Sequence, residues 1–154
     1  MFKQRPFPFS ILVLAVLITF YSVGSRFSLY WFYPQFDLFL HALSGLWIAL
    51  VILWLAVAFG QLSSLKDYRV KSFLIAFISA VLLGVVWELI ENIFQLSSIF
   101  SLNYSFDTAT DIITDALGGS IAYIYFVQKK RSFNKPADVI NISSNRGEIK
   151  KTNQ

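Results

Sequence analysis

The chain has 154 residues, of which 56% are hydrophobic and only 14% charged. A soluble globular domain has about 45–50% apolar and about 25% charged residues, so this composition excludes an ordinary soluble protein. The chain has no cysteine, which excludes a disulfide framework and a thiolate metal site. The formal net charge of +4 comes from basic residues that flank apolar blocks, a pattern that indicates membrane topology and no nucleic-acid partner.

Four segments are predicted to cross the bilayer as α-helices, because a spanning helix needs about 20 mostly apolar residues. The segments cover about residues 9–30, 36–59, 71–96 and 107–127. The fourth is interrupted by Asp111 and Asp115, but a helix with one acidic face can insert when that face meets other protein. We therefore predict an all-α integral membrane protein with four transmembrane helices in a single domain over residues 1–131.

The two ends of the chain have their own interpretations. Lys3 and Arg5 before the first apolar block, with the small residues of 23–25 near its end, also fit a cleaved signal peptide. We favour a retained span, because the apolar and aromatic residues continue beyond that point. Residues 132–154 are polar and are predicted to form a flexible cytoplasmic tail.

The short loops predict the orientation. Basic residues precede the first span, separate the second from the third, and follow the fourth: Lys3, Arg5, Lys66, Arg69, Lys71, Lys129, Lys130 and Arg131. The loops near 31–36 and 97–106 contain no Lys or Arg. Because positively charged loops stay in the cytoplasm, we predict a multi-pass protein of the inner (plasma) membrane with both termini cytoplasmic.

Six of the nine acidic residues, and the single histidine, lie in or beside spans two to four, near their predicted outer ends. These residues are Asp37, His41, Glu88, Glu91, Asp107, Asp111 and Asp115. Within each span they are three or four positions apart, which places them on one face of the helix. A carboxylate in hydrocarbon costs about 2.5–3.5 kcal/mol or more, so we expect the three faces to meet in a polar cluster that opens outward.

This cluster is the candidate site. The candidate metal ligands are Asp37, His41, Glu88, Glu91, Asp111 and Asp115, and the candidate catalytic residues are Glu88 and Glu91. Carboxylates with one imidazole suit Mg²⁺, Mn²⁺, Fe²⁺ or Zn²⁺, so a divalent metal ion is the candidate cofactor. Structural interpretations stay open: Asp37 could cap a helix, His41 could be a packing residue, and the acids could hold the helices together.

Three motifs, one in each of spans two to four, carry a family resemblance. They are Phe36-Asp37-x3-His41-x3-Gly45, Trp87-Glu88-x2-Glu91 and Asp107-Thr108-x2-Asp111-x3-Asp115-x2-Gly118. Together they cover about residues 36–122 and resemble the VanZ-like family of bacterial membrane proteins, and more closely its YjdF-like relatives. The resemblance implies a small helical protein that acts at the cell envelope, where VanZ itself is associated with resistance to glycopeptides.

Three functions are compatible with these residues. The first is a metal-dependent membrane enzyme that acts on a lipid-linked or envelope substrate at the outer face. The others are a carrier whose acids bind protons or a cationic group, and an accessory protein whose polar cluster orders the bundle. The sequence has no nucleophile elbow, phosphate loop or His-Glu-x2-His motif that would favour an enzyme, so enzyme status stays open. The substrate and the oligomeric state also stay open.

Overall fold

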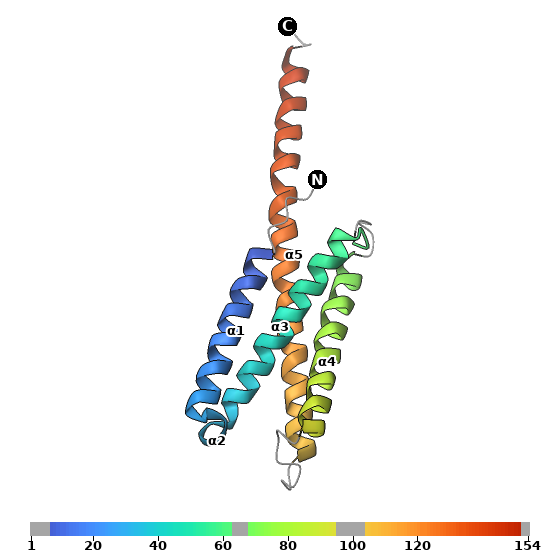
Figure 1. Cartoon of the computed structure of the whole chain (residues 1–154). Helices are drawn as coiled ribbons and strands as arrows, with labels where there is room; N and C mark the ends of the chain where they lie inside the picture. The colour runs from blue at the N-terminus through green and yellow to red at the C-terminus, as the bar shows by residue number, and fades with distance from the viewer. Residues whose placement is uncertain (1–6, 63–67, 95–103, 152–154) are drawn as a thin grey trace.

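The computed structural model describes residues 7–62, 68–94 and 104–151 and is helical throughout these ranges apart from short turns. Its elements are α1 (Phe7–Phe27), α2 (Leu29–Phe32), α3 (Pro34–Ala58), α4 (Tyr68–Phe94) and α5 (Tyr104–Lys151). The four long helices run in alternating directions, and the second half of α5 extends beyond the bundle (Figure 1). The starts of α3 and α5 therefore lie at the same end of the bundle as the end of α4.

Three of these helices are long and apolar enough to cross a membrane. By length and composition they are Pro8–Phe27, Gln35–Ala58 and Tyr68–Phe94. The all-helical fold and the first three spans are thus supported, with shifted ends. The first span ends at Phe27 and not near residue 30, because Ser28 adopts a left-handed backbone conformation (φ 54°) that breaks the helix before α2.

α3 forms the centre of the packing. It contacts α1, α4 and α5, and α5 also packs on α4. Glycines allow the backbones to approach: a Cβ on Gly45 of α3 would overlap the backbone of Asp115, and one on Gly118 of α5 would overlap the backbone of Ala42. Small residues at helix contacts are the usual basis of close packing between membrane helices.

The bundle part of α5 has a polar inner face and an apolar outer face. Its buried positions include Asp111, Asp115, Gly118, Gly119 and Ala122. Its exposed large hydrophobic residues are Phe106, Ile113, Leu117, Ile121 and Ile124. This is the reverse of a helix on the surface of a soluble protein, which turns its apolar stripe inward.

The ends of the chain differ from the sequence prediction. α5 does not end near Val127 but continues as helix to Lys151, across the segment predicted to be a flexible tail. The flexibility and the cytoplasmic location of residues 132–154 stay predictions.

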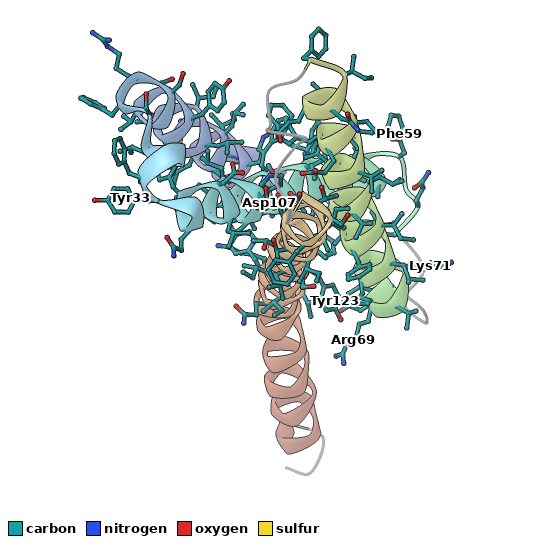
Figure 2. All side chains as sticks on the ribbon, turned by 90° about the horizontal axis from the view of Figure 1, so that it is seen from below. Tyr33, Phe59, Arg69, Lys71, Asp107 and Tyr123 are labelled. Atoms are coloured by element: carbon teal, nitrogen blue, oxygen red, sulfur yellow. The ribbon has the colours of Figure 1, made fainter. Side chains whose placement is uncertain are left out.

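Of the charged residues near the helix ends, Lys3, Arg5 and Lys66 lie outside the described residues. Arg69 and Lys71 are exposed at the start of α4, and Asp107 is exposed at the start of α5 (Figure 2).

Candidate functional site

His41 reaches the interior because of its position on α3. Asp37 lies in the first turn of this helix, where a negative charge interacts favourably with the helix dipole. His41 and Ser44 follow four and seven residues later, so all three side chains share one face. That face packs on α5, and His41 is only 4% exposed.

Asp115 of α5 is the most tightly held acid of the cluster. His41 donates a hydrogen bond from Nδ1 to Asp115 Oδ2 (2.8 Å), and the Ser44 hydroxyl donates to Oδ1 (2.7 Å). From the third helix, α4, Gly84 lies against the carboxylate, because a Cβ at this position would be 2.6 Å from Oδ2. Asp115 is fully buried, so its carboxylate is fixed between α3 and α4.

The second ring nitrogen of His41 faces two other acids. Nε2 lies 4.0 Å from Asp111 Oδ1, and one ligand atom each from Asp37, His41 and Asp111 all lie within 4.8 Å of one another. A separation of 4.0 Å is too long for a hydrogen bond. Asp111 is 3% exposed, and its Oδ1 atom is buried without a hydrogen-bond partner among the described residues.

The chemistry of this group fits a divalent metal ion. Two ligand atoms at about 2.0–2.2 Å from a tetrahedral ion are separated by about 3.3–3.6 Å, so the side chains would have to move closer by about 1 Å to bind one. A histidine that binds metal through one nitrogen usually donates the other N–H to a carboxylate. The hydrogen bond from His41 Nδ1 to Asp115 has this arrangement and leaves Nε2 to bind an ion.

The two glutamates of α4 have different surroundings. Glu88 is 7% exposed, and its Oε2 accepts a hydrogen bond from the Thr108 hydroxyl (2.7 Å). Its Oε1 is buried and has no hydrogen-bond partner within residues 7–62, 68–94 and 104–151. Glu91 is half-buried and accepts a hydrogen bond from Trp87 Nε1 (2.9 Å) on its own helix. Glu88 thus faces α5, whereas Glu91 is bonded within α4.

The cluster carries no basic counter-charge from Lys or Arg. Within the described ranges, both ion pairs of these acids involve His41, and none involves Lys or Arg. Burying a carboxylate without a partner is costly, and a buried group then either takes up a proton or binds a cation. The arrangement is therefore suited to binding cations that come from outside the protein.

Comparison with known protein families shows the family to which the chain belongs. A family model described as "Predicted membrane protein (DUF2238)" matches residues 3–131. The chain belongs to this family. The match to DUF2238 includes the whole helical bundle and every residue of the cluster, but not the end of α5. No match was found among the curated proteins or among the solved structures.

In this DUF2238 protein the residues selected from sequence do not all have one role. Asp37, His41 and Asp111 form the group that could bind a metal ion, while Asp115 is bonded to His41 and Ser44. Two further side chains of the cluster, Ser44 and Thr108, are not among the site residues predicted from the sequence. Their spacing could have indicated them: Ser44 lies three residues after His41, and Thr108 three residues before Asp111, so each shares the face of a site residue.

Proposed function

We propose that this protein binds a divalent transition-metal ion inside its helical bundle, with Asp37, His41 and Asp111 as ligands. The observation that carries the proposal is the buried Asp111 Oδ1, which has no hydrogen-bond partner among the described residues and lies beside His41 Nε2 in a group of ligand atoms within 4.8 Å of one another. One imidazole nitrogen with carboxylate oxygens favours Zn²⁺, Mn²⁺ or Fe²⁺, because Ca²⁺ and Mg²⁺ prefer sites made of oxygen alone.

We also propose that α5 is the fourth transmembrane span. Its exposed face is apolar, and its acids face α3 and α4, so insertion would leave no buried acid of this helix in contact with lipid. With the basic segments in the cytoplasm, the metal site would lie near the outer face of the plasma membrane. The resemblance to VanZ-like and YjdF-like proteins supports a bacterial cell-envelope location.

Three protein ligands leave coordination positions for water or a substrate, as in catalytic metal sites. This favours an enzyme that acts on a lipid-linked or envelope substrate. The alternative is a carrier or accessory protein whose polar cluster is structural or linked to protonation. The observation that favours a structural role is Asp115, whose two carboxylate oxygens are both bonded between helices.

Metal analysis of the purified, detergent-solubilised protein tests the metal site. The wild-type protein, purified from cells grown with Zn²⁺, Mn²⁺ and Fe²⁺, should retain a stoichiometric amount of one of these metals. His41→Ala and Asp111→Asn should each lower the metal content about tenfold or more. Asp107→Asn is the matched control, because Asp107 is an exposed acid one turn earlier on the same helix. A wild type without metal, or equal metal content in the Asp111 and Asp107 variants, would refute the proposal.

A further inference from the structure

Two buried carboxylates of the bundle each have an oxygen without a hydrogen-bond partner in the part of the chain that the structure describes. These atoms are Glu88 Oε1 on α4 and Asp111 Oδ1 on α5. Both residues are more than nine-tenths buried. A single ion bound by Asp37, His41 and Asp111 explains the unpaired oxygen of Asp111 but not that of Glu88.

The packing of α4 on α5 places Glu88 opposite Asp111. The two helices run in opposite directions (Figure 1), and Gly84 of α4 lies against the Asp115 carboxylate of α5. Glu88 follows Gly84 by one helical turn, and Asp111 precedes Asp115 by one turn. Because the two helices are antiparallel, both steps lead toward the same end of the bundle and place Glu88 across from Asp111. The hydrogen bond from Thr108 to Glu88 fixes this register, because Thr108 lies on the same face of α5 as Asp111.

We propose that a second divalent cation of the same kind binds between Glu88 and Asp111, so that Asp111 bridges two metal ions. This inference rests on the proposed function. Carboxylates that project from facing helices of a bundle are the usual ligands of paired metal ions in α-helical proteins. A bridging carboxylate gives one oxygen to each ion, and the two ions of such sites lie about 3.5–4 Å apart.

The charges of the cluster agree with two ions. Asp37, Glu88, Asp111 and Asp115 carry four negative charges when ionised, and no Lys or Arg pairs with them within the described residues. A single divalent ion with neutral His41 would leave two of these charges uncompensated in a low-dielectric interior, which is unfavourable. Two divalent ions balance these four, whereas the other two acids of the cluster, the half-buried Glu91 and the exposed Asp107, are less costly to leave ionised.

Counting Mn²⁺ on the full-length protein tests the second ion. Protein freed of metal with a chelator and reconstituted in lipid nanodiscs should bind two Mn²⁺ per chain by equilibrium dialysis. The electron paramagnetic resonance signal of isolated Mn²⁺ should decrease as the second ion binds, because the bridge couples the two spins. Glu88→Gln should bind one Mn²⁺ and keep the isolated signal.

Asp107→Asn is the matched control, since it neutralises an exposed acid one turn before Asp111 on α5. It should bind two Mn²⁺. One ion per chain in both the wild type and Glu88→Gln would overturn the second site and leave the first intact. Two ions in both would also overturn it, by placing the second ion elsewhere. No binding of Mn²⁺, and none of Zn²⁺ in the same dialysis, would refute the proposed function itself.

Glu88→Asp keeps the test decisive if Glu88→Gln does not fold, as judged by size-exclusion chromatography and helical circular dichroism. The shortened carboxylate should raise the dissociation constant of the second Mn²⁺ about tenfold or more, a loss typical of altered metal-site residues. The first constant should change less than the second. Equal changes in both, or no change in either, would contradict a second ion held by Glu88.

Discussion

Replacing Gly84 by alanine would test the orientation of His41 without altering any proposed ligand. A Cβ on Gly84 would lie 2.6 Å from Asp115 Oδ2, whereas ordinary van der Waals contact begins at 3.4 Å. The oxygen, or the helix that carries it, must therefore move by about 0.8 Å. Asp115 Oδ2 is the atom that accepts the 2.8 Å hydrogen bond from His41 Nδ1.

A shift of this size has a direct effect on the metal site. Movement of Oδ2 away from His41 lengthens the hydrogen bond beyond its normal range, and movement toward His41 displaces the ring. In both cases Nε2 leaves its place beside Asp111. Losing such a supporting carboxylate typically lowers metal affinity about 10- to 100-fold, which corresponds to about 1.4–2.7 kcal/mol. We expect Gly84→Ala to weaken metal binding by this amount.

Gly119→Ala provides the control for packing. Its Cβ would lie 2.7 Å from Ala80 Cβ and 2.8 Å from the Ala76 carbonyl oxygen, in the same α4–α5 contact but away from the carboxylate. Both variants should lower the thermal stability of the detergent-solubilised protein, because overpacking a close contact costs about 1–3 kcal/mol. Only Gly84→Ala should raise the metal dissociation constant, measured by competition with a chelator. Wild-type affinity in Gly84→Ala, or an equal loss in Gly119→Ala, would refute the reasoning.

Two further predictions concern the membrane. Reporter fusions after Lys66 and Arg131 should report a cytoplasmic location and a fusion after Asn103 an external one, and an external C-terminal fusion would contradict four spans with both termini inside. Asp111→Leu combined with Asp115→Leu should improve insertion of the isolated segment 104–127 by about 3 kcal/mol per substitution, while the full protein loses its metal. Retained metal in this double variant would show that the two acids do not form the site.

The elements of the fold were predictable because they depend on local properties of the chain. Length and apolar content suffice for α1, α3 and α4, and the structure contains all three. Spacing also sufficed to place Asp37 with His41, and Asp111 with Asp115, on single helix faces. The ligand atoms of Asp37, His41 and Asp111 do lie close together.

The division of roles within the cluster was not predictable, because it depends on how the helices are aligned. Spacing makes Asp111 and Asp115 equivalent, since both lie on the same face of α5. The close approach of Gly45 to the Asp115 backbone sets the alignment, and it brings Asp115 to His41 Nδ1 while Asp111 faces Nε2. Glu91 was similarly grouped with Glu88, but its hydrogen bond with Trp87 is a contact within α4.

The weak hydropathy signal of α5, the proposed fourth span, has a physical cause. A hydropathy average combines the acids of a helix with its apolar residues, so α5 is not among the helices selected by length and composition. The structure separates the two sets: Asp111 and Asp115 are buried against other helices, whereas Ile113, Leu117 and Ile121 are exposed. Insertion depends on the face that meets lipid, and that face of α5 is as apolar as a spanning helix requires. Asp111 and Asp115, which weaken the hydropathy signal, are thus the residues of α5 that other helices of the bundle cover.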